Sequence, residues 1–95
     1  MKKLKKNSQV LVIGKKWFDK TNGNTYHSSS LTVNGEFIDK VDFSYGYGSQ
    51  FEQTALDILQ KHYKGFEDIT MLWKIKEMGY ILTVINSGYG LKREL

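Results

Sequence analysis

The dipeptide Asn34-Gly35 is the feature that most constrains how this chain folds. Asn-Gly is the strongest two-residue signal for a β-hairpin, because both residues tolerate positive φ and the turn matches the twist of the flanking strands. It separates residues 25–33 from residues 36–43, two runs rich in β-branched, hydroxyl and aromatic residues. A third run, residues 8–19, precedes the corner Asn22-Gly23-Asn24 and has the pattern of another strand. We therefore expect three consecutive antiparallel strands.

The two-residue turn also sets the expected pairing across the hairpin. Tyr26 should lie opposite Phe43, and His27 opposite Asp42. One face, which we expect to be core, then carries Tyr26, Phe37, Val41 and Phe43. The other face carries a mixture that is open to solvent or to another molecule: Leu31, Val33, Ile38, Ser29, Lys40, His27 and Asp42. Asp39 falls on the apolar side, a local conflict that a β-bulge would remove.

A helical period begins shortly after the hairpin. Ser49 is a suitable N-cap, and Glu52 stands three residues later, as in a capping box. An apolar stripe with helical spacing runs through residues 51–63. Gly65 would end the helix in a left-handed conformation, just after Lys64.

Residues 70–78 are compatible with either a strand or a helix. Leu72, Ile75 and Met78 have helical spacing, and Gly79 followed by an aromatic residue resembles a helix stop, which favours the helix. A β-rich final strand follows over residues 80–86. The order βββααβ predicts an α+β fold, a two-layer sandwich with an antiparallel sheet of about four strands and helices on one face.

Length and composition suit one domain, residues 8–95, preceded by a basic arm, residues 1–7. With 95 residues and 40% apolar content, the chain can bury one core but not two. It contains no cysteine, which excludes disulfides and cysteine-based zinc sites and favours an intracellular setting. The apolar run behind the basic start, residues 10–13, is too short for a signal peptide or a membrane span.

The net charge of +4 is located in the arm. The chain has 14 basic and 10 acidic residues, and four of the basic ones are Lys2, Lys3, Lys5 and Lys6, so the rest of the chain is balanced. We expect a flexible arm that either contacts phosphate without reading bases or keeps the start of the chain solvated. A balanced body is not typical of a dedicated duplex-binding protein.

Candidate catalytic and metal-binding residues are few. His27 opposite Asp42, with serines nearby, suggests a base and its orienting group, but consecutive strand serines alternate faces, whereas a catalytic serine needs an exposed turn beside an oxyanion hole. The two histidines, His27 and His62, do not lie in a zinc-binding spacing. We expect no catalysis, no metal and no cofactor.

The segment Gly46-Tyr47-Gly48-Ser49 stands between a strand and a helix start, where free backbone N–H groups can bind an anion. A tight turn that needs positive φ explains the same glycines more simply. The tyrosines in these turns either pack or stack on exposed bases. The possible nucleic-acid or anion contacts are Lys2, Lys3, Lys5, Lys6, Tyr45, Tyr47, Ser49 and Tyr89.

The hairpin corner around Asn22-Gly23-Asn24 is the strongest candidate for a protein contact. Bulky aromatic residues flank hydrogen-bonding groups there, which is typical of interface anchors inside a polar rim. The predicted partner-binding residues are Lys15, Lys16, Trp17, Lys20, Asn22, Asn24, Tyr26 and His27.

Within residues 34–60, the run Gly46-Tyr47-Gly48-Ser49-Gln50-Phe51-Glu52-Gln53-Thr54-Ala55 enters a helix after a hairpin. It resembles the end of the double-stranded-RNA-binding domain, where a glycine-rich loop leads into a Lys-Lys-x-Ala-Lys helix. Gln50 and Phe51 stand where that family has phosphate-binding lysines, so this resemblance implies a shared local architecture only.

A broader pattern combines Trp17-Phe18-Asp19-Lys20, Gly23-Asn24-Thr25-Tyr26-His27-Ser28 and Tyr45-Gly46-Tyr47-Gly48. With these segments the chain resembles small uncharacterised accessory proteins of tailed phages and mobile elements. The resemblance implies no catalytic residues; its context is compact proteins that bind nucleic acid or block host enzymes acting on it.

We therefore expect a non-enzymatic binding protein that acts by protein-protein contact. The resemblance implies a partner that is a host protein or nucleoprotein complex in the cytoplasm of a bacterial host cell, and an inhibitor of a nucleic-acid-targeting defence system, such as an anti-CRISPR. The alternative is a direct nucleic-acid-binding module that uses the lysine arm and exposed tyrosines. No contact with a membrane is expected.

Overall fold

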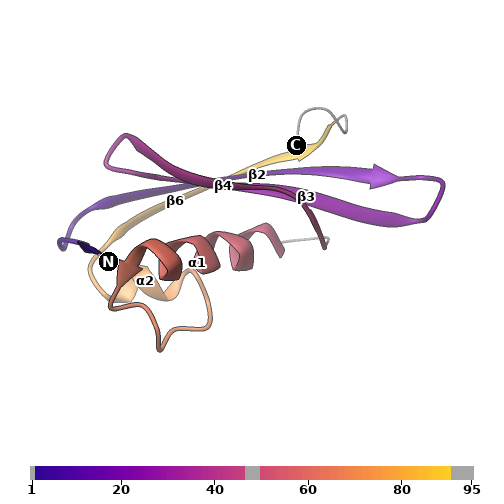
Figure 1. Ribbon diagram of the computed structural model, residues 1–95. Helices are drawn as coiled ribbons and strands as arrows, with labels where there is room; N and C mark the ends of the chain where they lie inside the picture. Colours follow the sequence, from indigo (N-terminus) through magenta and orange to yellow (C-terminus); the bar gives the residue numbers. More distant parts are fainter. Residues whose placement is uncertain (1, 47–49, 91–95) are drawn as a thin grey trace.

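A computed structural model describes residues 2–46 and 50–90 and shows a four-stranded sheet above two helices (Figure 1). The sheet order is β4-β3-β2-β6, and the two short strands β1 and β5 pair separately. The elements are β1 (Lys2–Lys3), β2 (Gln9–Asp19), β3 (Asn24–Val33), β4 (Glu36–Tyr45), α1 (Gln50–His62), β5 (Tyr63–Lys64), α2 (Lys74–Glu77) and β6 (Ile81–Tyr89).

The α+β class, with a four-stranded sheet and helices on one face, is confirmed (Figure 1). Two details of the prediction are wrong. The order βββααβ omits β1 and β5, and the sheet is mixed, because β6 pairs with β2 in parallel. The chain leaves the β4 edge, crosses the lower face through α1 and α2, and enters the sheet again at the opposite edge in the direction of β2. Such crossovers are the usual way to connect parallel strands.

The turn at Asn34-Gly35 forms as expected, with both residues at positive φ and Val33 paired with Glu36. Beyond Phe37 the expected register is wrong, because β4 contains extra residues at two irregularities. The first supplies the bulge expected near Asp39.

The second irregularity lies between Val41 and Ser44, where Phe43 has φ 57°. After it, Tyr26 pairs with Tyr45 and His27 with Ser44, so His27 does not lie opposite Asp42.

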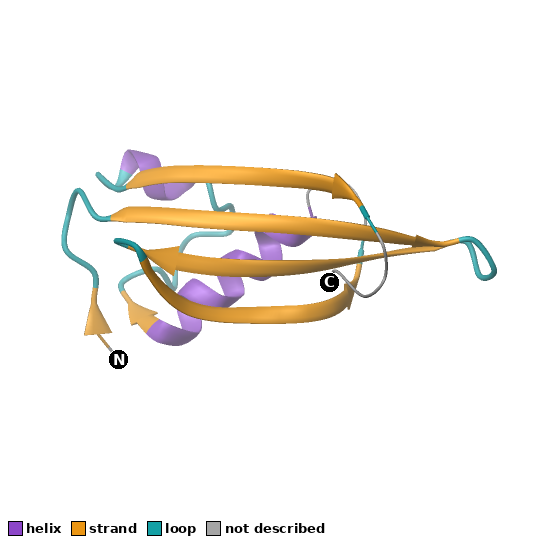
Figure 2. Cartoon of the chain, turned by 90° about the horizontal axis from the view of Figure 1, so that it is seen from above, coloured by secondary structure: helices purple, strands orange, loops and turns teal. Residues whose placement is uncertain are grey.

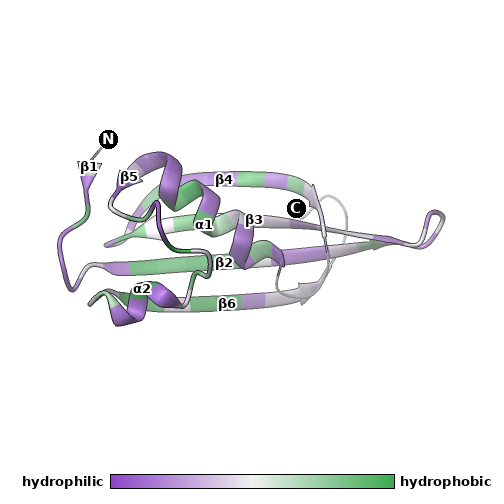
Figure 3. Ribbon diagram, turned by 90° about the horizontal axis from the view of Figure 1, so that it is seen from below, coloured by the Kyte–Doolittle hydropathy of each residue, from purple (hydrophilic) through white to green (hydrophobic). Residues whose placement is uncertain are grey.

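The expected core face is also wrong. The helices cover the face that carries Leu31 and Val33, whereas Phe37 is 62% exposed and Phe43 39% exposed on the other side. The strand pairing explains why this face is covered. Leu31 pairs with Val12, and Val33 pairs with Val10, so the covered face has a continuous aliphatic surface. Seen from below, this hydrophobic stretch of β2 runs between α1 and α2 (Figure 3).

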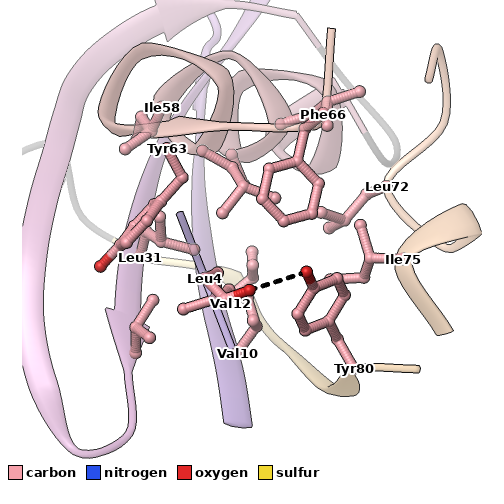
Figure 4. Close-up of a cluster of buried hydrophobic side chains, with 14 of the residues drawn as sticks. Leu4, Val10, Val12, Leu31, Ile58, Tyr63, Phe66, Leu72, Ile75 and Tyr80 are labelled. Carbon is pink, nitrogen blue, oxygen red and sulfur yellow. Dashed lines mark hydrogen bonds between the residues drawn. The ribbon is translucent and has the colours of Figure 1, made fainter. Parts of the chain in front are cut away.

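The core lies between this sheet face and the predicted stripe of α1, whose buried residues are Phe51, Ala55, Leu56, Ile58 and Leu59. Aromatic and aliphatic side chains from the segments around α2 complete it, including Phe66, Leu72, Ile75 and Tyr80 (Figure 4). Gly14 is required here, because a Cβ at this position would lie 2.2 Å from the ring of Phe51. The close approach of α1 to β2 therefore depends on the absence of a side chain.

Residues 70–78 are helical only over α2, a single turn. The expected stop at Gly79 is confirmed: Gly79 has φ 98°, and the N–H of Tyr80 donates to the carbonyl of Ile75 over 3.2 Å. Helix α1 ends two residues before the expected position, and Ser49 of the expected capping box lies outside the described residues.

The N-terminal segment, expected to be a flexible arm, lies against the domain. Strand β1 pairs with β5, and Leu4 is buried in the core. The hydroxyl of Tyr80 donates to the carbonyl of Leu4 over 3.0 Å (Figure 4). The buried side chain of Leu4, the β1–β5 pairing and this hydrogen bond together hold the segment against the domain.

Candidate binding surface on the open sheet face

The sheet face opposite the helices, here called the open face, is not covered by any of the described residues (Figure 2). Four aromatic side chains gather on it, one or two from each of three adjacent strands. This aromatic cluster consists of Trp17 on β2, Tyr26 on β3, and Phe43 and Tyr45 on β4. Strand pairing explains the grouping, because Tyr26 pairs with Trp17 on one side and with Tyr45 on the other.

The rings of the aromatic cluster are packed against one another. The ring centroids of Tyr26 and Phe43 are 4.5 Å apart, those of Trp17 and Tyr26 5.9 Å, and those of Trp17 and Phe43 5.7 Å. Tyr45 meets Tyr26 edge to face at 5.8 Å. Aromatic pairs at such distances contribute about 0.5–1.5 kcal/mol beyond the burial of area. The cluster is therefore held in place before any partner arrives.

The positive φ of Phe43 shows why this ring joins the cluster. Without the irregularity before Ser44, alternation along β4 would place Phe43 on the same face as Val41, which packs against the core. The bulge turns the ring to the open face instead.

A shallow hollow lies beside the cluster on the open face. Its apolar sides are Ile13 and Phe37, and its polar groups come from serine hydroxyls and two lysines. The polar lining residues are Lys15, Ser28, Ser30 and Lys40. Lys40 also forms an exposed ion pair with Asp42 at 2.9 Å. The hollow thus combines an apolar wall with groups that bind a carboxylate.

His27 lies on the opposite, covered side of the sheet. Its Nε2 is 2.7 Å from the Thr54 hydroxyl, and its Nδ1 is 3.3 Å from the carbonyl of Gly46. The carbonyl can only accept, so Nδ1 carries the proton and Nε2 accepts from Thr54. Burial lowers the pKa of His27, while the hydrogen bond to Gly46 opposes this shift. His27 is a neutral link between β3 and α1, away from Asp42.

The hairpin corner has its own local network. The Asp19 carboxylate accepts from the side chain of Asn22 at 2.8 Å and from the N–H of Thr21 at 3.0 Å. Lys20 and Asn22 are exposed, and Asn24 is half-buried. This tip projects beyond the helices (Figure 1).

The other predicted contacts are dispersed. Lys16 is buried on the covered side, with its Nζ 5.3 Å from the centroid of the exposed Tyr89 ring. Tyr45 belongs to the aromatic cluster, and Tyr89 does not. Tyr47 and Ser49 lie outside the described residues.

The N-terminal lysines lie at the other end of the molecule from the hairpin tip (Figure 1). Lys3, Lys5 and Lys6 line a groove together with Lys64. Lys6 donates to the carbonyl of Met78, and its Nζ is 5.0 Å from the ring centroid of Tyr80. Lys2 lies in β1.

The structure therefore brings together Lys15, Trp17, Tyr26 and Tyr45, and separates them from His27, Lys16 and the arm. Sequence reasoning missed Phe37 and Phe43, assigning both to the core. The available signal was the aliphatic set Leu31, Val33 and Ile38 on the other face, which suits a core better than a solvent-exposed surface.

Comparison with protein-family models finds no matching family, and comparisons with curated proteins and with solved structures find no match to the chain. Among the described residues, neither helix has the length and apolar character needed to cross a bilayer. Within the same residues, no group of three or more histidine or acidic side chains is placed to hold a metal ion.

Proposed function

We propose that this protein is a non-enzymatic binding protein whose open face docks a protein partner. The observation that carries the proposal is the aromatic cluster, in which Tyr45 is 65% and Phe43 39% exposed on an uncovered sheet face. Contiguous exposed apolar patches are uncommon on soluble proteins and mark interaction sites. Rigid aromatic residues are also the commonest anchors of protein interfaces.

The surroundings of the cluster indicate the partner's chemistry. Lys15 and Lys40 line the neighbouring hollow, beside Phe37. An apolar or aromatic segment with nearby carboxylates would match both features, because its side chains would pack on the rings while its carboxylates meet the ammonium groups. The ring packing argues against base stacking, since Tyr26, Phe43 and Trp17 already face one another.

The resemblance to phage accessory proteins supplies the partner class to test first. We propose that the partner is a host complex that acts on nucleic acid, and that the open face binds this complex and blocks it. A protein that covers a nucleic-acid channel needs a defined contact surface and no catalytic residues. Inhibition of the complex is the functional readout.

Capture from a bacterial lysate, followed by purification of the captured protein, makes the contact measurable. Tyr45→Ala should weaken binding of the purified partner at least about tenfold, as expected for an anchor residue. Trp73→Ala is the matched control, because Trp73 is an exposed aromatic residue at the start of α2, which lies on the other side of the sheet (Figure 1). Equal binding by both variants, with unchanged circular dichroism, would show that the open face is not the contact.

Direct nucleic-acid binding is a second candidate, supported by the four lysines around one groove. Titration with labelled single- and double-stranded nucleic acid at two salt concentrations tests it, since a phosphate contact weakens as salt rises. Lys5→Glu with Lys64→Glu should remove a salt-sensitive complex. Tyr45→Ala should leave that complex intact, because the groove is lined by the N-terminal segment and by residues around β5 and α2, and not by Tyr45.

A further inference from the structure

The two edge strands of the sheet, β6 and β4, differ in charge and in regularity, and both properties affect pairing with another chain. Strand β6 forms one edge, and across Ile81–Tyr89 it contains no charged residue and no proline. Several of its apolar side chains are exposed, including Ile85 at 44% and Val84 at 37%. Its pairing with β2 is regular from Ile81 to Asn86. One irregularity follows, between Asn86 and Tyr89. An edge strand that is regular over this length and uncharged is a template for pairing with another chain.

Strand β4, at the other edge, is protected against such pairing. Two irregularities interrupt it, and charged side chains stand along it at Glu36, Asp39, Lys40 and Asp42. Bulges and edge charges are the usual devices that prevent strand addition. The contrast indicates that pairing through β6 is tolerated and pairing through β4 is not.

We propose that β6 pairs antiparallel with β6 of a second copy of this chain, so that two four-stranded sheets join into one. Around a two-fold axis residue i of one strand faces residue j of its partner and j faces i, so a strand that pairs with its own copy must not bring like charges together. The uncharged β6 meets this requirement over its whole length. The absence of like-charge repulsion, and an edge that pairs with none of the described residues, favour a second copy as the occupant.

The assembly closes at two copies. Each copy uses its single β6 edge, and the remaining edges are both β4, whose bulges and charges oppose addition of further chains. A two-fold axis perpendicular to the sheet also leaves both open faces on one side. Helix α2 lies beneath β6 and reaches past it in the helix layer (Figures 2 and 3), and no described residue pairs with the outer edge of β6 in the plane of the sheet.

Sedimentation of the full chain at concentrations from about 1 to 300 μM tests the proposal, because a pair held mainly by edge hydrogen bonds dissociates on dilution. The expected result is a monomer–dimer equilibrium. Val84→Lys should shift the dissociation constant upward by at least about tenfold, since it introduces like charges at the two-fold contact. Phe37→Lys, a comparable change at the β4 edge, should leave the constant unchanged.

Ile85→Lys serves as a second variant if Val84→Lys melts at a lower temperature than the wild type. Nuclear Overhauser effects between labelled and unlabelled copies should arise from β6 residues. A wild-type chain that stays monomeric throughout would overturn the proposal. A dimer insensitive to both lysine variants, or contacts arising from the aromatic cluster, would also overturn it. None of these outcomes depends on the open face having a protein partner.

Discussion

His27 is the residue whose environment has the clearest thermodynamic consequence. It is buried, it bridges β3 to α1 through Thr54, and burial lowers its pKa from the ordinary value of 6.5. The unfolded chain therefore takes up a proton at this residue before the folded chain does. The stability that the neutral ring contributes is fully present above pH 6.5 and decreases as the pH falls below it.

We expect the free energy of unfolding, measured by urea titration, to decrease between pH 7.5 and pH 5. A single proton limits the slope to about 1.4 kcal/mol per pH unit. His27→Gln should be less stable at pH 7.5 and should flatten the slope. His62→Gln, which removes the half-buried histidine paired with Asp39, is the control and should keep the slope contributed by His27. An unchanged slope in His27→Gln would refute the assignment.

Gly14 provides a second test at the residue scale. Gly14→Ala should destabilise the fold by about 1–3 kcal/mol, because the added Cβ would overlap the ring of Phe51. Urea unfolding measures the change. In a Phe51→Leu background, Gly14→Ala should lower the free energy of unfolding by less than it does in the wild type. Equal losses of free energy in the two backgrounds would show that the destabilisation does not come from contact with Phe51.

At the scale of elements, sequence was informative where structure is local. The Asn34-Gly35 turn, the buried stripe of α1 and the stop at Gly79 each depend on residues within a few positions of one another, and all three are present. The covered sheet face was not predictable in this way. Both faces of β2 carry apolar residues, and which one is covered depends on where α1 docks.

The irregularities of β4 were even harder to predict from the sequence than the covered face. The two extra residues together leave Phe43 on the face of Tyr26, as expected, but that face is exposed because the helices cover the other one. The aromatic cluster was consequently predicted only in part, through Trp17, Tyr26 and Tyr45. The parallel position of β6 depends on a crossover that no short pattern encodes.

The segment formed by β1 and the residues after it contributes to the core through Leu4. Leu4→Ala should lower the free energy of unfolding by about 2 kcal/mol, since it removes a buried side chain from the core. Lys5→Ala changes an exposed neighbour and should have an effect below about 0.5 kcal/mol. Equal effects would show that this segment does not contribute to the core.

For the whole molecule, the main asymmetry is that the helices cover only part of the sheet. The β2–β3 hairpin continues past them to a tip held by hydrogen bonds around Asp19 (Figure 1). Local opening requires little free energy where few buried contacts oppose it.

Amide hydrogen exchange should therefore be graded along the hairpin. We expect the slowest exchange at Val10, Val12 and Leu31, above the core, and exchange faster by at least about a hundredfold in residues 20–24. Mass spectrometry of exchanged peptides or NMR measures the gradient. Uniform protection along β2 and β3 would contradict it.

The parallel pairing of β2 with β6 also has a consequence for synthesis of the chain on the ribosome. Strand β2 is made early, but its partner at the sheet edge emerges only after both helices. Until then β2 is itself an edge strand, with the apolar run from Val10 to Ile13 unpaired on one side. Nascent chains held in this state are aggregation-prone. Chains that stall before residue 81 should therefore bind chaperones that recognise apolar segments, and release them once β6 is added.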